Sequence, residues 1–196
     1  MAPKATELET YRTDCWNGAL HTYGTSAVFQ RRAIGLRQKL RILNYIGIAV
    51  PLLVGGLVVS YGAVKILPII IGVASAIGLV QLAVNAWAMT AGWVEAYSYA
   101  VGSVTENDSL ANRYQDLAKN PPLLDEMRQR YDKLQHEDGV RRSRDNEQGV
   151  TAAEKRYGMR AALRKYQRKC SACTQVPTTM KPGNCGVCGD YKFSEK

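Results

Sequence analysis

Charged and apolar positions divide the chain into a polar first part, two long apolar segments and a polar remainder. Neither residues 42–64 nor residues 66–94 contain an Asp, Glu, Lys, Arg or His. A helix that crosses the hydrocarbon core of a bilayer needs about 20 apolar residues, so each segment is long enough. A buried helical pair in a soluble protein is the alternative, but uncharged runs of this length rarely belong to a soluble fold. We therefore predict two membrane-spanning helices within residues 42–94.

Only the sequence SYGAVK separates the two predicted spans. So short a connection predicts a helical hairpin, with both ends of the pair on one side of the membrane. Five basic residues shortly precede the first span, whereas the connection offers only Lys65. By the positive-inside rule, the N-terminus and everything after the second span are therefore expected in the cytoplasm. The five basic residues are Arg31, Arg32, Arg37, Lys39 and Arg41.

Polar side chains follow one face of the second span. Ser75, Gln81 and Asn85, together with Gly78, recur at steps of three or four. In an oligomer these side chains could line a water-filled pore, since polar groups at membrane depth face a cavity or one another. The alternative is that they hydrogen-bond between helices, at about 1 kcal/mol for each bond. Two spans form a thin bundle, so we expect a homo-oligomer, and the absence of mid-span charge argues against a proton pump or ion-coupled transporter.

The polar parts of the chain are predicted to be helical. Residues 1–41 have apolar positions at helical spacing, which predicts a cytosolic amphipathic helix that runs into the membrane or lies at its surface. Residues 95–138 are expected to continue the second span into the cytosol, with a break at Pro121 and Pro122 and an end at Gly139. The segment 139–169 is expected to be a mobile basic loop followed by a helix. Thr151 opens that helix, with Glu154 at the spacing of a capping box.

The net charge of +9 is concentrated in one region, where residues 141–169 hold ten Lys and Arg against three Asp and Glu. Such an excess favours a polyanionic partner or an anionic membrane surface, although solvated basic helices are also common. Tyr157 and Tyr166 lie among the basic residues, and this combination suits phosphate contacts and base stacking. The candidate ligand-binding residues are Arg141, Arg142, Arg144, Lys155, Arg156, Arg160, Arg164, Lys165, Arg168 and Lys169.

Four of the five cysteines form a CxxC-x11-CxxC pattern in the tail, residues 170–196. The first forty residues lack the apolar core of a signal peptide, so a reducing compartment is expected, where metal thiolates are favoured over disulfides. We predict a small zinc-ribbon-like module whose four thiolates bind one structural Zn²⁺ and leave no open position for catalysis. An iron–sulfur cluster and a redox dithiol are the alternatives. The metal ligands are Cys170, Cys173, Cys185 and Cys188, and Cys15 is expected to be a free thiol.

No catalytic constellation is visible in the rest of the sequence. There is no glycine-rich phosphate loop and no nucleophile elbow. Of the two histidines, His21 stands alone and is expected to be packed or solvated, and His136 lies beside Glu137 and Asp138 and is expected to be solvated. We therefore expect that the protein is not an enzyme.

The tail spacing resembles that of the bacterial family described as mobilome CxxCx(11)CxxC proteins. The preceding architecture, a basic amphipathic helix, a tight two-span hairpin and a cytosolic helical extension over about residues 11–134, resembles the SLATT class of two-transmembrane defence effectors. The closest such system is of the Hailong type, in which a DNA oligomer made by a partner nucleotidyltransferase holds a tetrameric channel closed until infection removes it. No ligand-contact residue of these systems can be transferred to a position in this chain.

The resemblance implies an all-α homo-oligomeric protein, with a tetramer favoured, in the bacterial inner membrane. Its expected function is that of an anti-phage, abortive-infection effector: an ion channel or pore gated by a nucleotide or single-stranded oligonucleotide from a partner nucleotidyltransferase. A membrane-anchored zinc-binding adaptor that recruits protein or nucleic acid is the alternative, and a redox membrane protein that uses the CxxC pairs is a third possibility.

Overall fold

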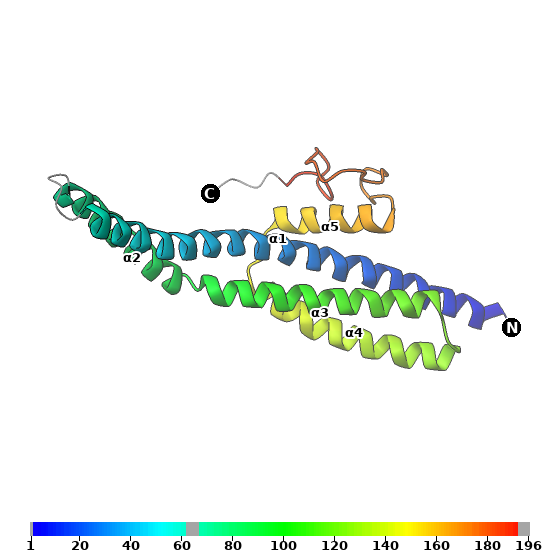
Figure 1. Cartoon of the computed structure of the whole chain (residues 1–196). Coiled ribbons are helices and arrows are strands. Elements are labelled where there is room, and N and C mark those ends of the chain that lie inside the picture. Colours follow the sequence, from blue (N-terminus) through cyan, green and yellow to red (C-terminus); the bar gives the residue numbers. More distant parts are fainter. Residues whose placement is uncertain (1, 62–66, 192–196) are drawn as a thin grey trace. The chain divides into compact units, whose positions relative to one another are not determined.

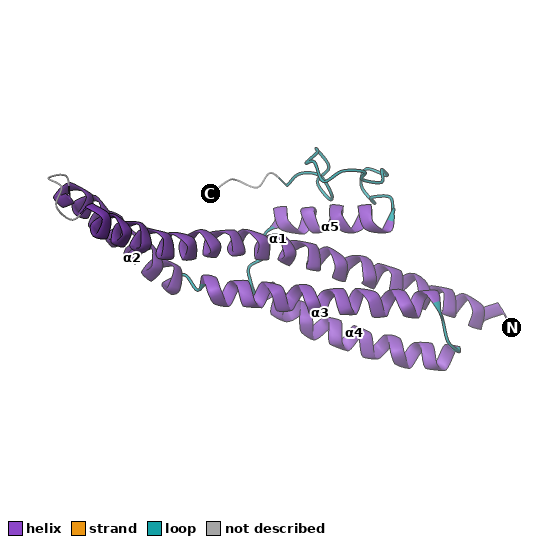
Figure 2. Cartoon of the chain, in the orientation of Figure 1, coloured by secondary structure: helices purple, strands orange, loops and turns teal. Residues whose placement is uncertain are grey.

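The computed structural model describes residues 2–61 and 67–191. This part of the chain forms five helices and no strand, which confirms the all-α prediction (Figures 1 and 2). The helices are α1 (Ala2–Tyr61), α2 (Leu67–Thr90), α3 (Trp93–Lys119), α4 (Leu124–Glu147) and α5 (Ala152–Tyr166). The chain divides into two compact units, one made of residues 1–31 and 100–196 and the other of residues 32–99.

The first unit has a core where the start of α1 packs against α3 and α4. Its centre is Tyr114 of α3, whose side chain is fully buried. Gly18 of α1 leaves room for this ring, because a Cβ atom at position 18 would lie 2.9 Å from the Tyr114 ring. The other buried members of the cluster come from all three helices: Cys15, Ala19, Leu110, Leu117, Ala118, Met127 and Leu134. These apolar residues recur at helical spacing, so burying them on one face stabilises each helix.

Helix α4 continues through Gly139 to Glu147, so the predicted end at Gly139 and the predicted mobile loop after it are wrong. The reason is a buried polar network between α3 and α4. The carboxylate of Asp145 accepts hydrogen bonds from Ser103 Oγ at 2.9 Å, Asn107 Nδ2 at 2.8 Å and Arg141 Nη2 at 2.5 Å. These bonds offset the cost of about 1 kcal/mol that a glycine imposes on a helix interior.

Helix α5 begins where the sequence predicts. The Thr151 side chain accepts a hydrogen bond from the backbone N–H of Glu154, and the Glu154 side chain accepts one from the backbone N–H of Thr151. This reciprocal capping box is therefore confirmed. The preceding break is confirmed as well, since α3 ends at Lys119 and α4 begins at Leu124, after both prolines.

The second unit contains the two apolar segments. Two helices in the described part of the chain, α1 and α2, are long and apolar enough to cross a membrane. Their apolar windows are 0% and 6% buried within the chain, so they are not the core helices of this unit. Pro51 lies inside α1 without interrupting it. The connection on which the predicted hairpin rests lies largely outside the described residues.

A turn separates the second apolar helix from α3, which corrects the prediction of one continuous helix through residue 94. Helix α2 ends at Thr90 and α3 begins at Trp93. Between them, Gly92 has a φ of +62°, a conformation that residues with a Cβ atom rarely adopt. The glycine therefore fixes the place where the helix stops.

Candidate metal centre and its basic surroundings

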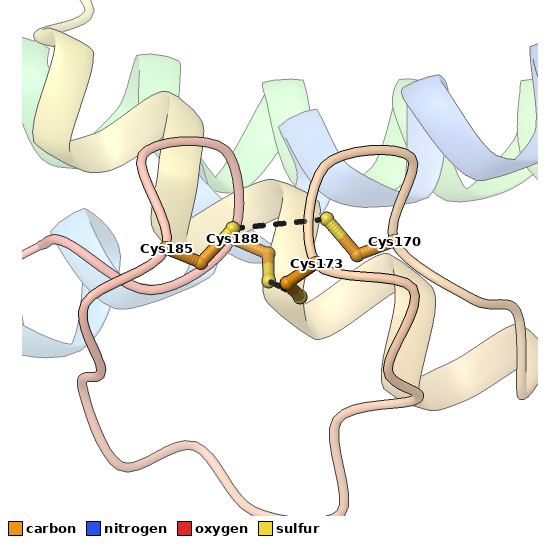
Figure 3. A group of neighbouring side chains, drawn as sticks. All are labelled: Cys170, Cys173, Cys185 and Cys188. Carbon is orange, nitrogen blue, oxygen red and sulfur yellow. Dashed lines mark hydrogen bonds between the residues drawn. The ribbon is translucent and has the colours of Figure 1, made fainter.

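The tail brings its four cysteines together from two short loops (Figure 3). All four sulfur atoms lie within 4.8 Å of one another. The Sγ atoms of Cys170 and Cys185 are 3.9 Å apart, and those of Cys173 and Cys188 are 3.8 Å apart. The described residues 170–191 form turns and loops without a strand, so the module lacks the β-hairpins of a zinc ribbon.

These distances fit a tetrahedral zinc ion. Four thiolates at about 2.3 Å from zinc stand about 3.8 Å from one another at the corners of a tetrahedron. A disulfide needs a sulfur–sulfur distance of about 2.05 Å, and all five cysteines are free thiols. The tail is therefore a four-cysteine site for structural zinc. Because the protein fills all four positions, a bound ion would stabilise the fold and would have no site for a substrate.

The backbone of each loop turns tightly around its first cysteine. The carbonyl of Cys170 accepts a hydrogen bond from the N–H of Thr174 at 2.8 Å, and that of Cys185 accepts one from Gly189 at 2.8 Å. A Cβ atom on Gly189 would lie 2.8 Å from the backbone nitrogen of Cys185, so only glycine fits there. Gly186, which the sequence suggests for a similar role, has open space around it.

The loops also favour deprotonation of one ligand. Backbone N–H groups of Val187 and Cys188 bond the Cys185 sulfur and lower the pKa of this thiol to about 6. Burial instead raises the pKa of Cys188. A bound cation would favour the thiolate form of both, because zinc ligation requires deprotonated cysteine.

Two arginines of α5 hold the tail against the helix. Arg156 donates to the carbonyl oxygens of Gly186 at 2.9 Å and Asp190 at 3.0 Å. Arg160 donates to the carbonyl oxygens of Thr179 at 2.7 Å and Cys188 at 3.2 Å. Both residues are predicted from the sequence to bind a ligand, but their guanidinium groups bind the chain itself. The sequence does not distinguish the two roles. Arginine is expected both where a protein binds a ligand and where one part of the chain packs against another.

Apolar contacts continue the attachment to α1. Cys170 and Cys188 are buried in a cluster with Leu20 of α1 and with Ala162 and Leu163 of α5. Arg168, after α5, donates to Asn17 Oδ1 of α1 at 2.8 Å. The metal centre is therefore packed into the first unit and is not a separate module.

The remaining predicted ligand-binding residues fall into two groups. Arg141 is buried between Glu106 and Asp145, so it cannot contact an external ligand in this conformation. Arg142 pairs with Asp138 at 2.5 Å. The other side chains are exposed: Arg144, Lys155, Arg164, Lys165 and Lys169.

The three predicted pore-lining residues do not share one environment. Ser75 is exposed, whereas Gln81 and Asn85 are half-buried. Gln81 lies where α2 meets α1, since a Cβ atom on Gly47 would lie 2.8 Å from Gln81 Nε2. Pore lining and polar contact between helices both stay predictions for these residues.

Cys15 contributes to packing, whereas His21 is exposed beside a cavity. Cys15 is fully buried, and burial followed by the charge of Asp14 raises the pKa of its thiol to about 11. Partial desolvation, and then the nearby Arg142, lowers the pKa of His21. Neither residue lies among the four cysteines, in agreement with the expectation that they are not ligands.

The sequence matches the family described as "Mobilome CxxCx(11)CxxC protein" over residues 12–191. No curated protein and no solved structure matches. The family match covers the helices as well as the cysteines, which is wider than the tail spacing alone suggests.

Proposed function

This chain belongs to the mobilome CxxCx(11)CxxC family, and from that premise we propose that it is a bacterial membrane effector of anti-phage defence. In this proposal the protein forms a homo-oligomeric ion channel or pore, with a tetramer favoured. A nucleotide or single-stranded oligonucleotide from a partner nucleotidyltransferase controls its opening. The two-span architecture, which resembles that of SLATT effectors, is the basis for the gating and for the defence role.

The observation that carries the proposal is the exposure of the apolar helices. The apolar windows of α1 and α2 are 0% and 6% buried. An apolar surface of this extent must be covered by lipid or by other copies of the chain. Side chains such as Ile48, Leu52 and Leu82 are about two-thirds exposed or more, at 65%, 70% and 66%. A membrane oligomer covers such residues with both.

The packing of the first unit supports a topology with both flanks in one compartment. Cys15 precedes the apolar segments and Tyr114 follows them, and both belong to the same buried cluster. If α1 and α2 each cross the bilayer, these flanks are on the same side. With the excess of basic residues before the first span, that side is the cytoplasm of the inner membrane.

A membrane-anchored zinc-binding adaptor is the second candidate function. Gln81 is half-buried and lies against Gly47 of α1, which favours a role for this side chain in holding the two helices together. In the adaptor, the apolar helices are an anchor and the zinc module recruits a protein or nucleic acid.

Bilayer recordings test the channel. The purified full chain should form a symmetric oligomer and conduct ions in a planar bilayer, with a conductance that changes when a single-stranded oligonucleotide is added. A confirmed oligomer that stays silent with and without oligonucleotide contradicts the channel and favours the adaptor. Mass analysis of nucleic acid that co-purifies with the oligomer identifies the natural ligand.

A further inference from the structure

A groove with a volume of about 480 Å³ lies between α1, α5 and the tail. Its walls carry Tyr23 and Gln30 from α1, and Tyr157, Arg164 and Lys165 from α5. Gln167 at the end of α5 and Met180 of the tail close it. We call these seven residues the tyrosine groove. All of its walls belong to the first unit of the chain.

Cations lie on the aromatic rings of this groove. Lys165 Nζ is 4.7 Å from the ring centroid of Tyr23, and Arg31 Cζ is 5.2 Å from that of Tyr157. Such contacts hold a charged group in place over the ring. Arg164 and Lys165 are exposed, so their charge reaches solvent.

Among the residues that the structure describes, no acidic side chain lines the tyrosine groove. Two other cavities of the same unit differ in this respect. One, beside His21, contains Asp145 and Arg142, and the second contains Asp116 beside Arg113 and Arg130. Three cations of those cavities also form ion pairs: Arg142 with Asp138, Arg113 with Glu137 and Arg130 with Glu126. Among the described lining residues, the tyrosine groove is the one of the three in which every charged side chain is basic.

We propose that the tyrosine groove binds a segment of single-stranded nucleic acid, with Arg164 and Lys165 at its phosphates. This inference rests on the proposed function and names the site and the ligand class for it. Lys165 and Arg31 lie over the rings of Tyr23 and Tyr157, so a base stacks on a ring by displacing the cation toward the phosphates, and such stacking needs no sequence preference. The Gln30 amide provides a donor and an acceptor for base edges, whereas the Gln167 amide donates to the carbonyl of Arg164. Gln30 and Tyr23 come from α1, so a search confined to the basic segment 141–169 cannot find them.

An anionic lipid headgroup would need the same cations. It has no use for two aromatic rings and the Gln30 amide beside them, whereas a nucleotide has a partner for each. The side chains that line the groove therefore favour nucleic acid over lipid as its ligand.

The test compares two charge-matched double variants of the full chain in nanodiscs of neutral phosphatidylcholine. The first variant carries Arg164→Gln and Lys165→Gln. The control carries Lys119→Gln and Lys133→Gln, which removes the same two charges from exposed positions of the first unit that lie outside the groove and outside the basic segment. The probe is a fluorescent oligothymidylate, titrated at several salt concentrations and followed by fluorescence anisotropy.

The groove variant should bind the probe about tenfold or more weakly, and the magnitude of the slope of log K against log salt should fall by about 1.4, at about 0.7 for each lost contact to a single strand. The control should bind within about twofold of the wild type. Equal loss in both variants, or in neither, overturns the proposal. It is also overturned if the groove variant keeps its oligothymidylate affinity and instead loses preference for nanodiscs that contain phosphatidylglycerol, since the groove then binds lipid.

The two proposals can fail separately. If the wild type conducts ions under control of the oligonucleotide while the groove variant binds and responds normally, the channel stands and this inference is wrong. If the groove variant loses the probe as expected but no conductance is ever recorded, the groove stands and the channel is wrong.

Discussion

The backbones of Gly24 in α1 and Gly158 in α5 touch: a Cβ atom on Gly158 would lie 2.5 Å from the carbonyl oxygen of Gly24. The same atom would lie 2.9 Å from Cγ2 of Val28. Since α5 and the four-cysteine centre share a buried cluster with Leu20, this contact fixes the distance at which they pack on α1. Any side chain at position 158 must push the two helices apart.

Replacing Gly158 by Ala should therefore destabilise the first unit by about 1–3 kcal/mol, the usual cost of overpacking. Thermal unfolding of the detergent-solubilised chain, with limited proteolysis of the tail, measures the effect. The matched control is Gly139→Ala, because Gly139 is also helical but has open space around its Cβ position. The control should gain about 0.5–1 kcal/mol from the better helix former. Equal behaviour of the two variants would show that the close contact is absent.

Loss of the metal should detach the tail before it affects the apolar helices. We expect metal analysis to find one tightly held zinc per chain, and Cys170→Ser to lose it. Without zinc, residues 170–191 should become sensitive to proteolysis and ligand control or assembly should weaken, while the helical content of the rest persists. Cys15→Ala is the control and should keep its zinc. A Cys170→Ser variant that assembles and responds to ligand normally would show that the tail is dispensable, and a metal-free wild type would favour the redox alternative.

Replacing Asp145 should lower the stability of the first unit more than most other substitutions do. Asp145→Ala leaves Arg141 buried without its partner on the same helix, a change that typically costs about 3–5 kcal/mol. Its expected result is a large drop in unfolding temperature. The comparison is Glu106→Gln, which removes the other carboxylate on Arg141 but from an exposed side chain, at about 1 kcal/mol or less. A similar small effect from both changes would contradict the buried network.

The thiol of Cys15 should resist alkylation at neutral pH. Its pKa is raised to about 11, so the reactive thiolate is scarce below that pH, and burial also excludes the reagent. Raising the pH toward 11 should speed the reaction, and unfolding at constant pH should speed it further. Mass spectrometry after iodoacetamide treatment measures the modified fraction. Rapid modification of Cys15 in the folded protein at pH 7 would be inconsistent with this packing.

Gln81 and Asn85 separate the two candidate functions. Replacing both with Leu should leave an adaptor active, apart from a loss of about 1 kcal/mol per hydrogen bond between helices. A pore that these side chains line should lose conductance and toxicity. Ser75→Leu provides the contrast, since Ser75 is exposed in the single chain and available to a lumen formed by several copies. Conductance that survives all three replacements would exclude this face of α2 from the pore.

Local sequence signals predicted the local features well. The capping box of Thr151 and Glu154 depends on residues three apart, and the sulfur cluster depends on two CxxC turns, so short-range spacing is sufficient for both. The break at the two prolines is of the same kind.

Features that depend on distant partners could not be predicted. Gly139 has the sequence character of a helix end, but Asp145 finds Ser103 and Asn107 on another helix, 42 and 38 residues earlier, and the helix continues. The role of Arg156 and Arg160 depends on carbonyl groups that exist only in the folded tail. The charge count located a basic region. It could not show which arginine and lysine side chains of that region form contacts within the folded chain.

The composition of the first unit has a consequence for its biosynthesis. Arg168 bonds to Asn17 across 151 residues, and the core needs α1 together with helices that follow both apolar segments. The ribosome makes the start of α1 long before it makes α3, α4 and α5. The face of α1 that carries Cys15 and Leu20 therefore stays exposed while the apolar segments are translated. The cysteine tail, which follows both apolar segments in the chain, then completes the buried cluster around Leu20. A chain truncated before Cys170 should reach the membrane with the Leu20 side of α1 partly uncovered, and should be a preferred substrate for quality-control proteases.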